Sequence, residues 1–157
     1  MYEILKNFNY PKNTNRNNIK IGDEIYRGFC LGLIYSWRTK TKQNHRRLKM
    51  KKYIYLFDET KKYFLNNSPE PDFKYTTIQY NSNHKCKKHK DKNNIGDSYI
   101  IGLGEYSGGR LIIYDENDNP KYIDINNKFY KFNGSQYYHE TEDFIGDRHT
   151  LVFFNII

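Results

Sequence analysis

The chain has 157 residues, which is enough for one domain with a single hydrophobic core. Two cysteines are too few for a disulfide framework, and the longest apolar run, residues 29–37, is far shorter than a membrane-spanning helix. The amino terminus lacks the charged and then apolar pattern of a signal peptide. We therefore expect a soluble intracellular protein without a membrane partner, while its compartment and oligomeric state are not indicated.

The net charge of +8 is distributed unevenly along the chain. Residues 1–70 carry 15 basic and 6 acidic side chains, whereas residues 71–157 carry 11 and 12. Lysine, asparagine, isoleucine and tyrosine are abundant and alanine is absent, as an A+T-rich coding sequence would produce whatever the function. The excess of lysine therefore has two explanations, which are codon bias and attraction for a polyanion.

The first part of the chain predicts two strands followed by one helix. Runs of β-branched and aromatic residues predict strands at 19–21 and 28–37. Asn44 is a candidate N-cap for a helix that ends near Asn66, before the helix-breaking residues 68–71. The buried stripe expected on this helix consists of Leu48, Tyr53, Leu56, Phe57 and Phe64.

Between the strand and the helix, residues 37–52 contain eight Lys or Arg side chains and no acidic one. Such a run attracts phosphates without regard to sequence. A solvated loop and helix start in a lysine-rich chain explains the run equally well. The candidates for a nucleic-acid patch are Arg38, Lys40, Lys42, Arg46 and Arg47.

After the helix, short strand-like runs alternate with turn residues to the end of the chain. This number of short strands fits a mainly β fold with a flanking helix, of the double-stranded β-helix, jelly-roll or cupin-like type. Residues 1–157 would form a single domain, in which residues 1–72 pack on a barrel made by residues 73–157. The predicted strands lie at 74–81, 84–89, 99–103, 110–114, 122–125, 129–132, 136–139 and 150–156.

Two histidines and a carboxylate form the first candidate site. In an extended segment residues i and i+2 point to the same face, so His89 and Asp91 present an imidazole and a carboxylate side by side. His139, from a distant strand, would complete two His and one carboxylate on one face of a metal, the pattern of non-haem Fe(II) oxygenases. A structural zinc site that includes His84, Cys86 and His89 is the alternative, although the other cysteine lies far upstream.

The last strand supplies a second set of polar side chains. Alternation puts Arg148 and Thr150 on one face and His149 on the other, where it would serve packing or face solvent. A guanidinium and a hydroxyl on one face can together bind a carboxylate. The strands of His139 and Arg148 are expected to be neighbours joined by a turn at residues 144–147.

These elements resemble the 2-oxoglutarate and Fe(II)-dependent dioxygenases, whose motif is His-x-Asp, a distal His, and an Arg followed at the second position by Ser or Thr. The runs 89–94, 102–111 and 144–148 are similar to the branch that contains the TET and J-binding-protein nucleobase oxygenases. The resemblance covers roughly residues 73–157, and nothing comparably specific precedes it.

The resemblance implies an iron enzyme with a keto-acid co-substrate. His89, Asp91 and His139 would hold Fe(II), while Arg148, helped by Thr150, would bind the far carboxylate of 2-oxoglutarate. With O2 the products would be succinate, carbon dioxide and a hydroxylated C–H bond, so the cofactors supply the difficult chemistry and the protein orients it.

Side chains near the motif are candidates for binding the co-substrate and the substrate. Barrel packing explains tyrosines on flanking strands equally well, and asparagines directly after the Asp ligand can cap a turn instead of touching substrate. The co-substrate candidates are Tyr80, Asn81 and Tyr99, and the substrate candidates are Asn93, Asn94 and Arg110.

The sequence leaves three possible functions open, of which two are enzymatic and one is not. The resemblance and the basic run favour the methyl group of a pyrimidine in DNA or RNA, which must be flipped out of a duplex or already single-stranded. A prolyl or lysyl side chain of a protein, or a small molecule, would be hydroxylated by the same chemistry. The non-enzymatic alternative is a basic nucleic-acid-binding barrel without iron.

Overall fold

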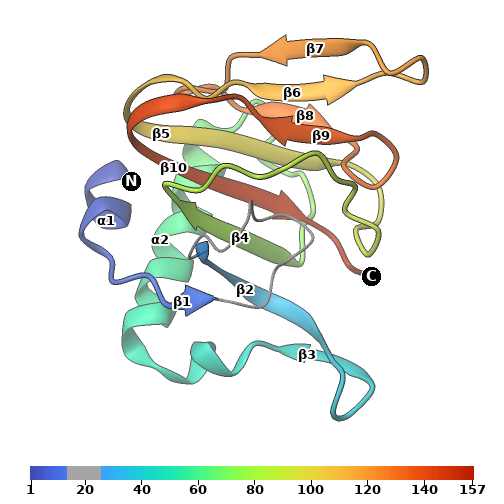
Figure 1. Cartoon of the computed structure of the whole chain (residues 1–157). Coiled ribbons are helices and arrows are strands. Elements are labelled where there is room, and N and C mark those ends of the chain that lie inside the picture. The colour runs from blue at the N-terminus through green and yellow to red at the C-terminus, as the bar shows by residue number, and fades with distance from the viewer. Residues whose placement is uncertain (14–25) are drawn as a thin grey trace.

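The computed structural model describes residues 1–13 and 26–157, so the strand predicted at 19–21 lies outside the described residues. The described chain is mainly β, with two antiparallel sheets and short helices (Figure 1). The larger sheet contains, in spatial order, β1 (Lys12–Asn13), β2 (Tyr26–Ser36), β4 (Thr77–Ser82), β10 (Phe144–Phe154), β5 (Ser98–Gly108) and β8 (Tyr130–Phe132), and β3 (Thr41–Asn44) pairs with β2. The smaller sheet contains β7 (Pro120–Ile123), β6 (Leu111–Tyr114) and β9 (His139–Thr141).

Helices cover one face of the larger sheet. They are α1 (Tyr2–Asn7), the short 3-10 helix η1 (Arg46–Lys49) and α2 (Lys51–Asn67). Leu5 of α1 and Leu56 of α2 are fully buried in the same cluster as Ile78, Leu151 and other apolar residues of the sheet. Burial of this apolar area is the main source of stability for such a layer. None of the helices in the described ranges is long and apolar enough to cross a membrane.

The start of the predicted helix is wrong, whereas its buried stripe is largely confirmed. Asn44 does not cap a helix, because it is the last residue of β3 and pairs with Leu33. His45 caps η1 instead, and its Nδ1 accepts a hydrogen bond from the Arg47 amide at 3.1 Å. Of the expected stripe, Tyr53, Leu56 and Phe64 are buried, while Leu48 and Phe57 are partly buried.

The strands predicted after the helix are found within a few residues, with one exception. Residues 84–89 form no strand and make only the isolated bridge between His89 and His139. The segment contains no β-branched or aromatic residue apart from its histidines, so nothing in it favours a pleated conformation. Short elements that the sequence did not predict are α1, β1 and β3.

The strands of His139 and Arg148 are not neighbours, contrary to expectation. β9 belongs to the smaller sheet and pairs with β6, whereas β10 runs through the larger sheet between β4 and β5. The chain crosses between the sheets at residues 142–143, and residues 144–147 already pair with β5. A separate apolar cluster, which includes Ile100 and Leu111, joins residues of both sheets.

Candidate metal centre and its cavity

A cavity of about 850 Å³ lies between the two sheets. Its volume is in the range typical of small-molecule sites, roughly 300–1,000 Å³. Strands β2, β4 and β10 line it from the larger sheet, β6 and β9 line it from the smaller sheet, and residues 84–95 of the loop after β4 complete the wall.

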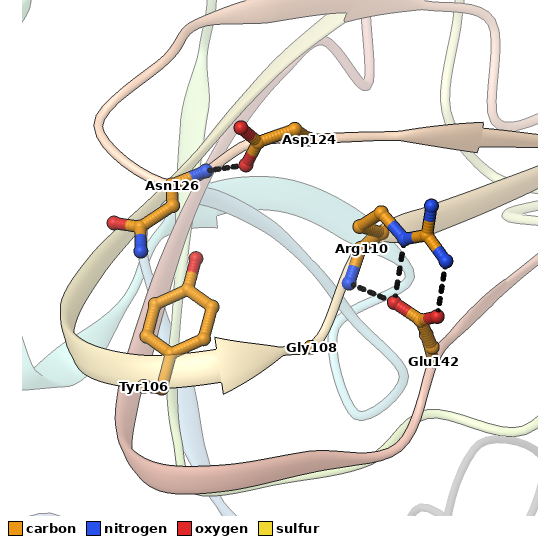
Figure 2. Close-up of a pocket in the computed structure, with 6 residues that line it drawn as sticks. All are labelled: Tyr106, Gly108, Arg110, Asp124, Asn126 and Glu142. Atoms are coloured by element: carbon orange, nitrogen blue, oxygen red, sulfur yellow. Dashed lines mark hydrogen bonds and ion pairs between the residues drawn. The ribbon is translucent and has the colours of Figure 1, made fainter.

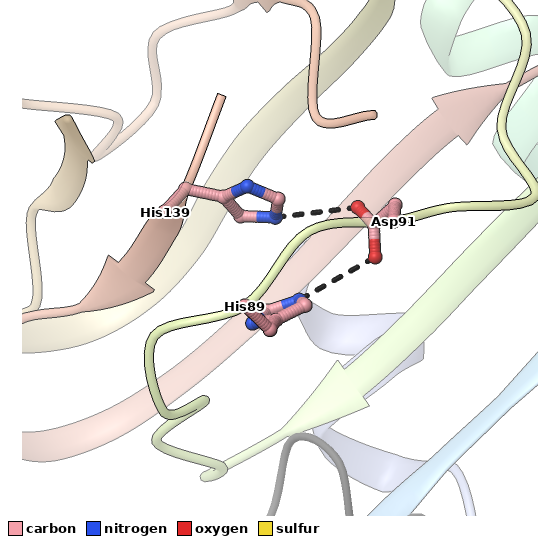
Figure 3. Close-up of side chains that lie close together, drawn as sticks. All are labelled: His89, Asp91 and His139. Carbon is pink, nitrogen blue, oxygen red and sulfur yellow. Dashed lines mark ion pairs between the residues drawn. The ribbon is translucent and has the colours of Figure 1, made fainter. Parts of the chain in front are cut away.

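His89, Asp91 and His139 meet at the cavity wall (Figure 3). The His89 Nε2 lies 3.4 Å from one Asp91 carboxylate oxygen, and the His139 Nε2 lies 3.2 Å from the other. Their ligand atoms lie within 4.8 Å of one another, and the rest of the described chain contains no second cluster of this kind. The zinc alternative is therefore not supported, because His84 and Cys86 line the cavity without joining such a cluster.

Backbone contacts orient both imidazoles. The Nδ1 of His89 lies 2.6 Å from the Lys87 carbonyl oxygen, and the Nδ1 of His139 lies 3.0 Å from the Tyr137 carbonyl oxygen. A carbonyl oxygen only accepts, so each Nδ1 carries the proton and donates it. A ring protonated at Nδ1 can bind a metal through Nε2, the atom that lies near Asp91 in both histidines.

The loop backbone holds Asp91 in place. The amides and carbonyls of His89 and His139 exchange two hydrogen bonds of 3.0 Å, and the Asp91 amide donates to the Gly134 carbonyl at 2.8 Å. Burial raises the pKa of the Asp91 carboxyl, but its contacts with His139 and His89 outweigh that effect and keep the pKa below its usual range. Asp91 is therefore a carboxylate near neutral pH and is able to bind a cation.

Gly134 is a site residue that sequence reasoning missed. A Cβ at this position would lie 2.9 Å from an Asp91 carboxylate oxygen and 3.1 Å from the His139 ring. The absence of a side chain therefore leaves room for these two groups to approach one another. Its sequence context, Asn-Gly-Ser, resembles any turn, so only the fold reveals the contact.

Arg148 is a buried cation in the same cavity, with only 4% of its surface exposed. Its Nε and Nη2 donate to the Gly109 carbonyl at 3.1 and 2.9 Å, and its guanidinium carbon lies 5.6 and 5.3 Å from the ring centres of Tyr106 and Phe144. No described carboxylate forms an ion pair with it. Burial lowers the pKa of the guanidinium, which nevertheless stays charged.

Thr150 and Asn81 lie beside Arg148, as expected. The two residues are paired across β10 and β4, and the Asn81 Nδ2 donates to the Thr150 Oγ1 at 2.9 Å. Both line the cavity, whereas His149 points to the opposite face and contacts Tyr10 and Asp147. A buried cation flanked by a hydroxyl, without a protein counter-ion, suits an incoming carboxylate.

Two of the predicted co-substrate residues lie on the wrong face of the sheet. Tyr80 is fully buried under the helices and stacks on Phe29 at a centroid distance of 5.0 Å. Tyr99 is buried in the same cluster and its hydroxyl donates to Glu70 at 2.8 Å. Neighbouring residues of a strand face opposite sides of the sheet. Because Asn81 points into the cavity, Tyr80 points away from the cavity. The structure therefore corrects the placement of both tyrosines.

Arg110 lies outside the cavity that holds the candidate metal ligands. Its guanidinium donates to both carboxylate oxygens of Glu142 at 2.8 and 2.6 Å and helps line a separate cavity of about 460 Å³ (Figure 2). This ion pair lowers the pKa of Glu142 to about 2. The paired and displaced Arg110 is therefore not a substrate residue of the main cavity.

Asn93 and Asn94 lie at the edge of the turn that follows Asp91, and their contact with substrate stays a prediction. The Asn94 amide donates to the Asp91 carbonyl at 3.0 Å and so closes a turn after the candidate ligand. Both residues also line the cavity. The turn role is therefore seen for the Asn94 backbone, and both residues are near enough to the cavity to meet a substrate.

The five candidates for a nucleic-acid patch are divided between two elements. Lys42 lies on β3 and lines the cavity, and Arg38 and Lys40 are exposed at the adjoining turn. Arg46 and Arg47 belong to η1, where the Arg47 guanidinium carbon lies 5.8 Å from the Phe29 ring centre. Two further lining residues, Tyr35 and Trp37, were not predicted, although a single tryptophan at the start of a basic run was a usable signal.

No family model matches the sequence, and no curated protein matches it. A 2OG-Fe(II) oxygenase family oxidoreductase from Burkholderia pseudomallei matches the structure with a TM-score of 0.65 and 13% identity, over 97% of this chain and 74% of that one. OsALKBH1 matches with a TM-score of 0.55 and 12% identity, over 98% of this chain and 87% of that one.

NgTET1 in complex with 5mC DNA matches with a TM-score of 0.57 and 16% identity, over 82% of this chain. The matched region is 60% of the NgTET1 chain. At these identities the likeness concerns the fold alone. The chain therefore has the fold of the 2OG-Fe(II) oxygenases, as the sequence motifs predicted.

Proposed function

We propose that the protein is an Fe(II)- and 2-oxoglutarate-dependent dioxygenase that hydroxylates a C–H bond. The observation that carries this proposal is the presence, in one cavity, of the His89, Asp91 and His139 cluster and the unpaired buried cation of Arg148. Two imidazoles and a carboxylate suit Fe(II) and leave other coordination positions for ligands. A barrel that only binds nucleic acid requires neither feature.

The donor set fits the cofactors, and each residue has a separate task. When bound, iron, 2-oxoglutarate and O2 supply an oxidation in which 2-oxoglutarate becomes succinate and carbon dioxide, one oxygen atom entering succinate and the other the substrate C–H bond. His89, Asp91 and His139 would hold the iron, while Arg148 and Thr150 would hold the far carboxylate of 2-oxoglutarate. Apolar lining residues, among them Ile100, Leu111 and Phe132, would limit access of water.

We further propose that the hydroxylated group is the methyl group of a pyrimidine in DNA or RNA. The fold likeness to NgTET1 in complex with 5mC DNA supports this choice. The cavity has room for more than a small keto acid, and basic and aromatic side chains lie at its edge. A prolyl or lysyl side chain and a small molecule are the competing substrates for the same chemistry.

The experiment that tests the function is anaerobic reconstitution with Fe(II) and 2-oxoglutarate, followed by admission of oxygen and measurement of succinate. The wild type should form succinate, and His139→Ala and Arg148→Ala should not. Arg27→Ala, which removes an exposed arginine, is the matched control and should behave as the wild type. Activity that survives in Asp91→Ala, or a folded wild type that neither binds iron nor forms succinate, would contradict the assignment.

The same reaction, supplied with a panel of substrates, tests the substrate class. Methylated single-stranded and duplex oligonucleotides are compared with prolyl and lysyl peptides. Our proposal expects stimulation of succinate formation by a methylated oligonucleotide, together with a hydroxymethylated base among the products. If only a peptide stimulates succinate formation, the oxygenase activity is supported and the proposed pyrimidine substrate is replaced by a protein side chain.

A further inference from the structure

The larger sheet carries an arm that extends past its edge (Figure 1). Residues 28–32 of β2 pair with β4, whereas residues 33–36 pair with β3. We call residues 33–44, the end of β2, the turn and β3, the β2–β3 arm. All four residues of β3 are exposed, so the arm is not held by packing along its length.

Hydrogen bonds at Gly32 and its neighbours fix the base of the β2–β3 arm. Gly32 has a φ of +104°, and a Cβ there would lie 2.3 Å from the Thr76 carbonyl oxygen, so glycine is required. The Leu33 amide donates to the same carbonyl at 3.0 Å, and the Thr77 hydroxyl donates to the Leu33 carbonyl at 2.7 Å. An isolated two-stranded hairpin is marginally stable, so these bonds give the β2–β3 arm a defined direction.

The surface of the β2–β3 arm combines aromatic rings with unpaired cations. Trp37 is 81% exposed and Tyr35 is 42% exposed, and their ring centres are 4.8 Å apart in an edge-on arrangement. The arm contains no acidic residue, and no described carboxylate forms an ion pair with its three cations. These cations are Arg38, Lys40 and Lys42.

The β2–β3 arm is continuous with the proposed catalytic cavity. Tyr35, Trp37 and Lys42 line the same cavity as the metal-ligand cluster. Lys92 also lines it, and the Nζ of the nearby Lys90 lies 4.6 Å from the ring centre of the half-exposed Tyr138. A polyanion that crossed the entrance would therefore meet cations on the arm and on the loop that follows β4.

We propose that the β2–β3 arm binds single-stranded nucleic acid, with Lys40 and Lys42 at the phosphates and Trp37 stacked on an unpaired base next to the one in the cavity. The proposal rests on the proposed function and specifies the form of its substrate. A cationic surface with exposed aromatic rings is the usual platform for single strands, because the cations attract the phosphates and the rings stack on the bases. An acidic peptide would contact the cations but would not stack on the face of the Trp37 ring. In a duplex the faces of the paired bases are stacked on neighbouring bases and are not exposed to the ring.

Trp37 is the only tryptophan of the chain, so its fluorescence reports directly on stacking at the β2–β3 arm. Iron-free protein is titrated with a pyrimidine-rich single-stranded oligonucleotide of about 12 nucleotides, a length within the range of known single-strand sites. We expect quenching of Trp37 fluorescence, and weaker binding of the same sequence as a duplex. A polyglutamate peptide of equal charge should leave the fluorescence unchanged.

Binding by the variants is followed through the anisotropy of a labelled oligonucleotide. Trp37→Ala should weaken binding by about tenfold or more. The double variant Lys40→Gln with Lys42→Gln should reduce the slope of log K against log salt by about 1.4, which is about 0.7 for each phosphate contact of a single strand. The matched control is Lys61→Gln with Lys62→Gln on α2, which removes the same charge from the helix-covered side and should bind as the wild type.

Unquenched Trp37, equal loss of binding in the α2 control, or equal binding of duplex and single strand would overturn the proposal. Failure of the β2–β3 arm is distinguishable from failure of the enzyme, because binding is measured without iron. Succinate formation without single-strand binding would remove the arm proposal alone. Single-strand binding with no succinate under any condition would retain the arm proposal and remove the oxygenase.

Discussion

The two faces of β4 and β10 have different tasks although their residues alternate along the same strands. Toward the helices, Tyr80, Leu151 and Phe153 are fully buried in an apolar cluster. Toward the smaller sheet, Arg148 and Thr150 are almost as buried but line a cavity. The comparison teaches that equal burial does not mean equal function, because one face packs against protein and the other is shaped for a ligand.

The largest difference expected between the two faces concerns stability. Phe153 is fully buried, and its ring centre lies 4.5 Å from that of Phe64, so Phe153→Ala should lower the free energy of unfolding by about 3–5 kcal/mol. On the cavity face, Thr150→Val keeps the volume and loses one hydrogen bond, which should cost about 1 kcal/mol. Urea denaturation measures both, and equal losses would refute the division between the faces.

The next effect concerns the co-substrate. Arg148→Lys keeps the charge but loses the planar fork, so the KM for 2-oxoglutarate should rise about 10- to 100-fold, from the loss of charged hydrogen bonds worth about 1.5–3 kcal/mol. Succinate formation at varied 2-oxoglutarate concentrations measures this change. A lower free energy of unfolding with an unchanged KM would show that Arg148 is structural, like the residues of the opposite face.

A smaller effect is expected at Gly134, in the loop between β8 and β9, which lies against two of the candidate metal ligands. Gly134→Ala would place a methyl group against Asp91 and His139, so affinity for Fe(II) should fall about tenfold, as for other changes that disturb metal-ligand orientation. Anaerobic metal titration measures the affinity. Ser135→Ala, next along the chain, is the control, and an equal effect there would point to a general change in the loop.

The remaining effect, a dependence of stability on pH, lies at the base of the β2–β3 arm, outside both faces. Burial, with the nearby charges of Arg47 and Arg46, lowers the pKa of His45 to about 4. The unfolded histidine has a pKa of about 6.5 and binds the proton first, so stability should fall as the pH drops from about 6.5 toward 4. His45→Asn should weaken this dependence when unfolding is compared at the two ends of that range. An unchanged dependence would show that other groups cause it.

The sequence by itself determined which residues could form the candidate site. The i, i+2 spacing of Arg148 with Thr150 limits this pair to one face of β10, and both residues line the cavity. His89 and Asp91 line it as well, although their segment is a loop with one isolated bridge. The chemistry of the residue types restricted the ligands to a metal and a carboxylate. The jelly-roll fold was predictable because short β-rich runs and turn residues are local signals.

Only the tertiary structure decided which face of each strand meets the cavity. Tyr80 and Tyr99 lie on strands beside cavity residues, and the sequence around them does not distinguish the two faces. The helices cover their side of the sheet and bury them in the apolar cluster. The close approach of Gly134 to Asp91 and the position of Trp37 at the cavity depend on segments far apart in the chain. Alternation along a strand specifies two faces, whereas the elements packed on each face specify which one buries apolar side chains and which one binds a ligand.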